Sequence, residues 1–356
     1  MTNHQLTHLR LLNQCISITN IKTPEDVVRW MGCMQAQDLS MAKWAVGLRM
    51  QKSTIQTVDE ALNKGDILRT HILRPTWHLV ASTDISWILE ITAPRIKASL
   101  NSRHKQLGFT SAMLDLSYRI LIEILSGNRH LTREDISLHF NNAGLSTDEN
   151  RLSHLLLCAE LEKIICSGSS INNKPTYALF DERIPQQTAY TKETALKNLA
   201  IRYFQSHGPA TLPDFNWWSG LSAKEAREAF EMVRSGFESI TLGPDTYLYS
   251  NPHQKFLAMQ HNLFLLPAFD EYLISYKNRA AMLTSAPEKV VSNNGIFRPM
   301  IVLDGEVIGI WKRQTKKDTI SIETQLFKAI DKQANSLIAE AANRYGNFYS
   351  KKVVIS

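Results

Sequence analysis

The stretch ILRTHILRPTWHLV, residues 67–80, contains two runs of β-forming residues joined by Arg74 and Pro75. Branched and aromatic side chains dominate both runs, and a proline at the junction is typical of a turn and not of a strand interior. The stretch therefore predicts a β-hairpin with strands over residues 67–73 and 76–80.

Helical patterns precede this hairpin. Thr23 followed by Pro24 is a typical helix start, because the threonine side chain can cap the helix and proline fits its first turn. Two further helices are predicted over residues 39–50 and 57–64. The segment MQAQDLS, residues 34–40, falls between the first two helices and places two glutamines two residues apart.

The order of helices followed by a hairpin recurs twice. The second round has predicted helices over 111–125, from 131 and over 149–163, and short strands over 164–167 and 177–180. The third has helices over 193–206, 212–218 and 222–234, and strands over 237–242 and 247–249. Three rounds of three helices and a two-stranded wing predict tandem winged helices, which typically bind duplex nucleic acid.

The remainder of the chain has more strand signal. Strands are predicted over 263–266, 299–303 and 307–311, with Asp304 and Gly305 as a hairpin turn, and a closing helix over 322–344. The predicted fold is α+β and mainly α. Its modules are a winged helix over 1–105, a second over 106–188, a third over 189–260, and a β-rich extension with the closing helix over 261–356.

Composition limits the class of protein. The 356 residues carry 40 Lys and Arg against 34 Asp and Glu, a net charge of +6 that is compatible with a polyanionic partner but does not establish one. The four cysteines form no C-x-x-C pair, so we expect buried thiols in a reducing compartment and no metal site. Without a leader or a long apolar run, we expect a soluble, cytoplasmic protein with no membrane partner.

Five strings together resemble the winged-helix family that includes the AlkZ and YcaQ DNA glycosylases. The strings are QAQD at 35–38, LRTHILRPTWHLVASTD at 68–84, HGPATLPDFNWWSGLS at 207–222, LLPAFDEYLISYKNR at 265–279 and VLDGEVIGIWKR at 302–313. The resemblance covers about residues 5 to 345. It implies a C-shaped monomer that cradles double-stranded DNA, uses no cofactor, and removes alkylated purines by cleaving the N-glycosidic bond, interstrand crosslinks included.

The resemblance also implies a catalytic pair. The AlkZ branch has a Gln-x-Gln motif, which Gln35 and Gln37 match, whereas the YcaQ branch has Gln-x-Asp. Alternate residues of an extended segment face one side, so the two amides can converge only if this segment is not helical. Asp38 directly precedes a predicted helix, and capping that helix competes with a role as a base. No lysine stands out as a nucleophile, so a monofunctional glycosylase is expected.

Several residues are candidate DNA contacts. Arg69 and Arg74 flank the first hairpin and are expected to contact phosphate, although solvated arginines have the same pattern. His78 could reach phosphate or the attacking water, with a packing role as its alternative. Trp77 is a core residue or a stacking platform.

In the extension, the basic residues Arg298, Lys312 and Arg313 are expected near DNA, and the family implies a hairpin in the minor groove. The loop 293–298 is either that probe or an ordinary surface loop. Asp270 is interpreted as structural, with anchoring of the third module as one option, and at least one of Trp217 and Trp218 is expected in the core.

Two other functions compete with the glycosylase. A winged-helix transcription regulator would bind an operator sequence, often as a dimer, and release no base. A protein that sequesters a small genotoxin would bind the free compound tightly without DNA.

Overall fold

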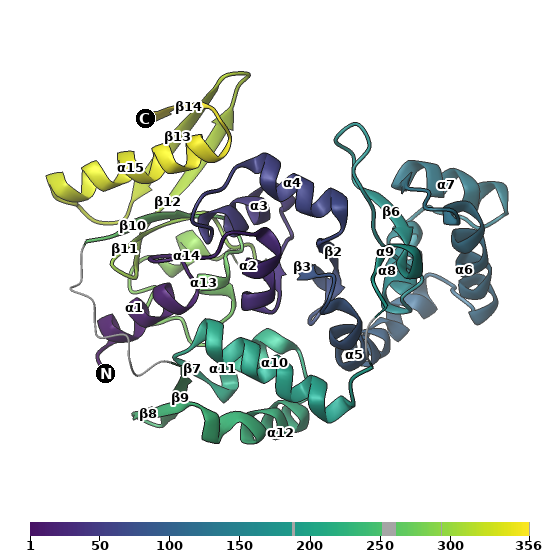
Figure 1. Cartoon of the computed structure of the whole chain (residues 1–356), viewed down its shortest axis with the longest axis horizontal. Coiled ribbons are helices and arrows are strands. Elements are labelled where there is room, and N and C mark those ends of the chain that lie inside the picture. The colour runs from purple at the N-terminus through teal and green to yellow at the C-terminus, as the bar shows by residue number, and fades with distance from the viewer. Residues whose placement is uncertain (187–188, 251–260, 293, 356) are drawn as a thin grey trace. The chain divides into compact units, whose positions relative to one another are not determined.

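The computed structural model describes residues 1–186, 189–250, 261–292 and 294–355, and it combines helices with strands (Figure 1). Its chain divides into two compact units. Unit 1 contains Met1–Asp59 and Leu196–Ser356, and unit 2 contains Glu60–Ala195. The mixture of helices and strands agrees with the predicted class.

Unit 2 contains the hairpin predicted from residues 67–80. β2 (Ile67–Ile72) pairs antiparallel with β3 (Thr76–Ala81), and Ile72 faces Thr76 at the closed end. The first strand ends one residue before its predicted limit, because Leu73 has a φ of 59° that breaks the extended backbone. Both predicted runs are therefore confirmed.

The rest of unit 2 surrounds a second sheet. Its strands lie in the order β4, β6, β5, and all pairs are antiparallel. The bounds are β4 (Leu131–Thr132), β5 (Ile165–Ser167), β6 (Thr176–Leu179), α5 (Ile85–Gln106), α6 (Ser111–Leu125), α7 (Arg133–Asn142), α8 (Arg151–Leu161) and α9 (Phe180–Arg183). Thr132 caps α7 through a reciprocal bond with Asp135, as the sequence at 131–136 predicts.

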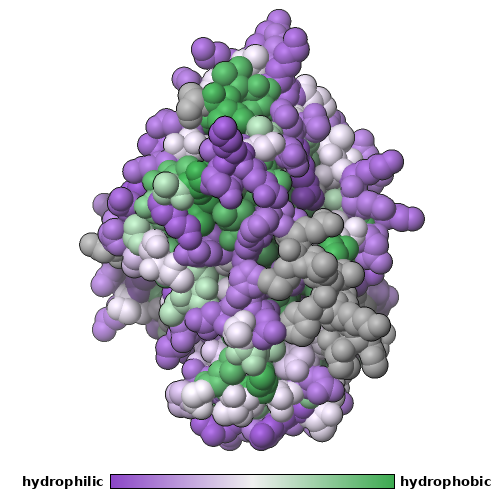
Figure 2. Space-filling model, turned by 90° about the vertical axis from the view of Figure 1, so that its left-hand side faces the viewer, coloured by the Kyte–Doolittle hydropathy of each residue, from purple (hydrophilic) through white to green (hydrophobic). Residues whose placement is uncertain are grey.

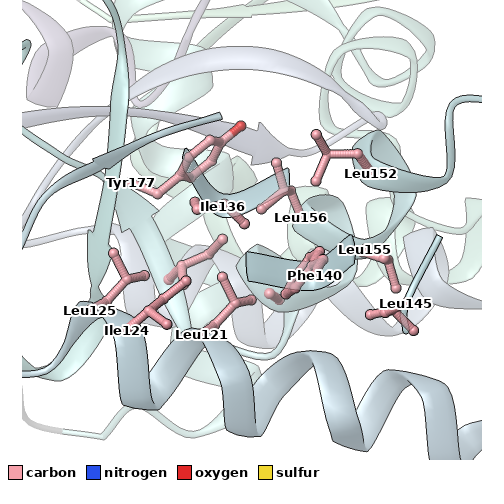
Figure 3. Packing of buried hydrophobic residues seen from close by; sticks show 12 residues of the cluster. Leu121, Ile124, Leu125, Ile136, Phe140, Leu145, Leu152, Leu155, Leu156 and Tyr177 are labelled. Atoms are coloured by element: carbon pink, nitrogen blue, oxygen red, sulfur yellow. The ribbon is translucent and has the colours of Figure 1, made fainter. Parts of the chain in front are cut away.

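The core of this region is a cluster of apolar side chains from several elements (Figure 3). Leu121 and Leu125 of α6 pack with Phe140 of α7, Leu155 of α8 and Tyr177 of β6, and each is at most 8% exposed. Removing these surfaces from water favours folding by roughly 25 cal/mol per Å². The helical period of the apolar residues in α6 and α8 thus accounts for their packing.

Unit 1 contains the third round of helices and strands, apart from residues 192–195 at the start of its first helix. The bounds are α10 (Lys192–His207), α11 (Leu212–Ser219), α12 (Ala223–Val233), η1 (Arg234–Gly236), β7 (Ala210–Thr211), β8 (Glu238–Leu242) and β9 (Asp245–Tyr249). The strands lie in the order β7, β9, β8. Phe204, Phe215 and Trp218 are fully buried between these helices, which confirms the prediction that one of the paired tryptophans is core.

Unit 1 also contains a five-stranded sheet in the order β10, β11, β12, β13, β14. The bounds are β10 (Leu263–Leu266), β11 (Met300–Leu303), β12 (Glu306–Thr315), β13 (Thr319–Leu326), β14 (Lys352–Ile355), α13 (Glu271–Ile274), α14 (Pro287–Val290) and α15 (Lys332–Phe348). The pairing is antiparallel except for the parallel pair of β13 and β14.

One prediction for this region was wrong. The closing helix begins at Lys332 and not near Ile322, because residues 319–326 form β13. Ile320 and Ile322 are both fully buried and alternate with more exposed neighbours, which is the period of a strand. The helix itself starts where Asp331 accepts the main-chain N–H of Ala334.

Three helices at the start of the chain belong wholly to unit 1. They are α1 (Asn3–Asn13), α2 (Pro24–Met31) and α3 (Leu39–Leu48), and α4 (Ile55–Lys64) follows them. Thr23 caps α2 and Pro24 occupies its first turn, as predicted. α1 and the 22-residue α5, which contains Pro94, were not predicted.

On the face shown in Figure 2, hydrophilic residues separate several smaller hydrophobic groups. Scattered apolar residues are normal on a protein surface, so these groups alone do not indicate a binding site.

Candidate functional site

The two glutamines lie on a non-helical segment of unit 1 between α2 and α3. β1 (Met34–Gln35) is extended, and Gln37 and Asp38 form a bend before α3 begins. The condition for convergence of the two amides, a segment that is not helical, is therefore met. Their surroundings differ, since Gln35 is 7% exposed and Gln37 is exposed.

Gly32 sets the direction in which this segment leaves α2. Its φ of 77° lies in the left-handed region that favours glycine. A Cβ atom at this position would lie 3.3 Å from Cβ of Arg202 and 3.4 Å from the ring of Trp218. The segment with the two glutamines therefore starts from a point that is closely packed against α10 and α11.

Asp38 ends the segment by capping α3. Its Oδ1 accepts the main-chain N–H of Met41 at 3.1 Å, and its backbone is extended. The capping interpretation is confirmed, and the carboxylate is engaged in a structural bond at the helix start.

Two adjacent acidic residues of unit 1, Asp270 and Glu271, form hydrogen bonds with residues at Gln35 and at the end of α3. Glu271 Oε1 accepts the main-chain N–H of Gln35 at 2.6 Å. Asp270 forms a two-pronged ion pair with Arg49, which directly follows α3, at 2.8 and 2.9 Å. Burial acts to lower the pKa of Arg49, but the charge and hydrogen bonds of Asp270 outweigh it and raise that pKa.

The structural interpretation of Asp270 is thus confirmed, but its partner belongs to the predicted first module and not to the third. In the predicted third module, Asp214 has a role of this kind. Its Oδ1 accepts the main-chain N–H groups of Lys277 and Asn278 at 2.9 and 3.2 Å. Asp214 therefore connects α11 to the segment that follows α13.

The Trp77 ring of the first hairpin contacts the side chains of Arg69 and His71. The guanidinium carbon of Arg69 lies 4.2 Å from the Trp77 ring centre, and the His71 ring centre lies 3.7 Å away. His71 Nδ1 is 2.8 Å from Oε2 of the buried Glu160. Trp77 is only partly buried, so it is neither a pure core residue nor an open stacking platform.

The other candidate contacts of this hairpin differ in exposure. His78 is fully buried, and its Nδ1 lies 2.8 Å from the carbonyl oxygen of Thr76. This environment fits the packing role given as its alternative. Arg69 and Arg74 are partly buried and remain predicted phosphate contacts.

In the extension, Arg298 and Lys312 have exposed side chains. Arg313 is partly buried: it contacts the hydroxyl groups of Tyr345 and Tyr349 and donates to Ser40 Oγ at 2.7 Å. It therefore connects β12 to the start of α3. Residues 294–296 of the candidate probe loop are exposed, and Asn293 lies outside the described residues.

Comparison with known proteins identifies the family. Residues 28–348 match the family described as "DNA glycosylase AlkZ-like". The chain belongs to the AlkZ-like DNA glycosylases. This membership confirms the resemblance found in the sequence and assigns the chain to enzymes that cleave N-glycosyl bonds in DNA. It favours an enzyme over a regulator or a genotoxin-sequestering protein.

Two matches to this AlkZ-like chain, one by sequence and one by structure, both come from Streptomyces sahachiroi. One is named an interstrand DNA cross-link repair glycosylase and is 23% identical over 344 residues, which cover 91% of this chain and 92% of that protein. The other is the solved structure of DNA glycosylase AlkZ, with a TM-score of 0.79 and 21% identity over 100% of both chains. The second likeness shows that the two share a fold.

Sequence reasoning missed Glu271 as part of this AlkZ-like site, although it lies in the quoted string LLPAFDEYLISYKNR. The available signal was an acidic residue at the start of the apolar run YLI, where burial requires a partner. Among the described residues, no helix combines the length and apolar character needed to cross a membrane.

Proposed function

We propose that this enzyme hydrolyses the N-glycosidic bond of purines alkylated at N7 in duplex DNA, with Gln35 and Gln37 orienting the attacking water. The observation that carries the proposal is the non-helical segment on which both amides lie, directly before α3, whose first turn is capped by the carboxylate of Asp38. With Asp38 engaged in this cap, we assign the catalytic role to the two side-chain amides of the motif.

Two amides suffice for this chemistry because the leaving group is already charged. A purine alkylated at N7 is cationic, so the electrons of the breaking bond between C1′ and N9 neutralise it, and no acid is needed. Water forms the new bond to C1′ and loses a proton to solvent. The two side-chain carbonyls orient that water and place partial negative charge beside the oxocarbenium-like sugar.

The same mechanism explains why normal bases would be spared. An unmodified purine leaves as an anion unless it is protonated, and glutamine cannot supply a proton as a carboxylic acid would. Selectivity for alkylated purines therefore follows from the absence of a strong acid in the Gln-x-Gln pair itself. We expect hydrolysis on stacked DNA, since a crosslinked base cannot be freely flipped out.

The fold supports DNA binding in the proposed function. We assign the helix and hairpin rounds to winged helices over 1–105, 106–188 and 189–260, followed by the extension over 261–356, in a C-shaped, cytoplasmic monomer. Arg69, Arg74, Arg298 and Lys312 are the proposed phosphate contacts. Arg313 and His78, predicted for the same role, have the structural contacts described above.

Interstrand crosslinks are a second proposed substrate. The relative from Streptomyces sahachiroi is named for crosslink repair, and the two chains align over nearly their whole length. Crosslinks through N7 of guanine give the same cationic leaving group, so the same residues would act on them.

The test is release of 7-methylguanine from a methylated duplex by the purified protein. Gln35→Ala and Gln37→Ala should each lower the single-turnover rate by roughly 100-fold or more, as expected for loss of a positioning group, while DNA affinity is kept. Unchanged rates in both variants would refute the catalytic pair. A wild-type protein that binds DNA but releases no base from methylated or crosslinked duplexes would refute the substrate assignment.

A further inference from the structure

Glu271 is a buried carboxylate that binds the main chain of the Gln-x-Gln motif. It lies at the first position of α13, is 2% exposed, and accepts the N–H of Gln35 through Oε1 at 2.6 Å. The two residues are 236 positions apart in the sequence. A charge-assisted bond of this length is stronger than one between neutral groups.

The second oxygen of Glu271 is held from two other directions. Trp218 Nε1 donates to Oε2 at 3.2 Å, and Ser275 Oγ donates to the same oxygen. Trp218 is fully buried, and its ring centre lies 4.9 Å from that of Tyr203. The carboxylate therefore cannot rotate without breaking contacts to α11 and to its own helix.

The His207 ring also lies beside the Glu271 carboxylate. Its Nε2 lies 3.7 Å from Glu271 Oε2, and its Nδ1 lies 2.7 Å from Ser206 Oγ. The ring is fully buried and stacks on Tyr203 with centres 4.8 Å apart. Tyr276 donates to the carbonyl oxygen of His207 at 2.7 Å, which connects His207 to the segment that follows α13.

We propose that Glu271 is a positioning residue for the glycosylase reaction, which fixes the main chain at Gln35 and through it the direction of the Gln35 amide. The inference rests on the proposed function of Gln35. A carboxylate is expensive to bury, by several kcal/mol before its hydrogen bonds are counted, so its place beside the motif requires specific partners. The partner that belongs to the motif is the Gln35 N–H.

The expected effect follows from the geometry of water positioning. Without the anchor, the peptide at Gln35 can shift by an ångström or so, and a misplacement of that size lowers catalysis by roughly 100-fold. DNA affinity should stay within about twofold, because Glu271 is buried and carries no phosphate-binding group. A role in stability alone would instead lower the melting temperature and leave the rate intact at low temperature.

Asp214 provides a matched control in the same unit. It is 1% exposed and also accepts main-chain N–H groups, those of Lys277 and Asn278, together with that of Thr211 at 3.1 Å. These three partners lie outside residues 34–40. Asp214→Ala should therefore destabilise the fold as Glu271→Ala does, while the Gln35 main chain keeps its anchor.

The first experiment compares Glu271→Ala, Glu271→Gln and Asp214→Ala with the wild type in single-turnover release of 7-methylguanine, well below each melting temperature. We expect a roughly 100-fold loss for Glu271→Ala. Glu271→Gln should recover part of it, because its carbonyl oxygen can still accept from Gln35. Asp214→Ala should retain the wild-type rate. Wild-type kinetics for Glu271→Ala, or an equal loss for Asp214→Ala, would overturn the inference.

A second measurement needs no substrate. Hydrogen exchange of the Gln35 amide, followed by NMR in protein labelled with 15N-glutamine, reports the anchor directly. Exchange should be slow in the wild type and in Asp214→Ala, and at least tenfold faster in Glu271→Ala. Equal protection in all three proteins would overturn the inference. If the wild type releases no base but shows this pattern, the anchor stands and the proposed substrate fails.

Discussion

The ion pair between Arg49 and Asp270 predicts a large and specific loss of stability when one partner is removed. Both side chains are at most 1% exposed, and the two guanidinium nitrogens lie 2.8 and 2.9 Å from the carboxylate. Asp270→Ala would leave the charge of Arg49 buried without its counter-charge, at a cost of about 3–5 kcal/mol. The lost bond to the Tyr272 N–H at 2.9 Å adds about 1 kcal/mol.

Replacing both partners should cost much less. In Arg49→Met with Asp270→Ala neither charge of the pair remains, and the losses reduce to the Tyr272 bond and the bonds that Arg49 donates to Gln14 and Ala45. We expect about 1–3 kcal/mol for the double variant, from roughly 1 kcal/mol per hydrogen bond. The coupling energy between the two sites should then be at least about 3 kcal/mol.

Urea unfolding followed by tryptophan fluorescence measures this cycle, because five of the seven tryptophans lie in unit 1. Asp59→Ala is the control: Asp59 pairs with Lys43 but is 40% exposed, so its loss should cost under about 1 kcal/mol. A cost below about 1 kcal/mol for Asp270→Ala, or additive single variants, would show that the buried pair does not support the fold as argued.

Four further predictions concern other parts of the chain. Asp38→Ala should lower the free energy of unfolding by about 1 kcal/mol, measured by urea titration, through loss of the α3 cap. Arg298→Ala and Lys312→Ala should each reduce the salt dependence of DNA affinity by about 0.9 in log–log slope, and an unchanged slope would exclude a phosphate contact. Burial raises the pKa of Cys15 to about 11, so its alkylation by iodoacetamide at pH 8 should be roughly 100-fold slower in the folded than in the unfolded protein. Burial lowers the pKa of His207 below the unfolded value near 6.5. The contribution of neutral His207 to the free energy of unfolding is therefore fully present above that pH and decreases below it. His207→Gln should reduce the loss of stability measured between pH 8 and 5.

The repeating helices and hairpins could be predicted because their signals are local. Residues 67–80 contain their own strand runs and turn, and α6 spans the same residues, Ser111–Leu125, that its apolar period predicts. The exception, β13, has an equally local signal in the alternation of Ile320 and Ile322. It was merged with α15 because the polar residues of the two elements run together without an evident turn.

Contacts over long sequence distances could not be predicted in the same way. The sequence gives no pattern that pairs Gln35 with Glu271 or Arg49 with Asp270, because such pairs depend on how whole elements pack. The run DEYLI at 270–274 carries a local signal that was not used: two carboxylates precede an apolar run, and if they are buried they require partners. Which residues satisfy them is decided by the tertiary structure.

The carboxylates around the motif help to explain why the proposed catalytic groups are amides. Asp38 accepts from Met41, Glu271 accepts from Gln35, and Asp270 is paired with Arg49, so each has a structural partner. These bonds give each carboxylate a structural role at the position where it lies. Water beside Gln35 and Gln37 would therefore be oriented more than deprotonated, and a weakly activated nucleophile reacts usefully only when the base departs easily. On this reasoning, the hydrogen bonds that fix the motif and the preference for cationic purines have the same structural origin.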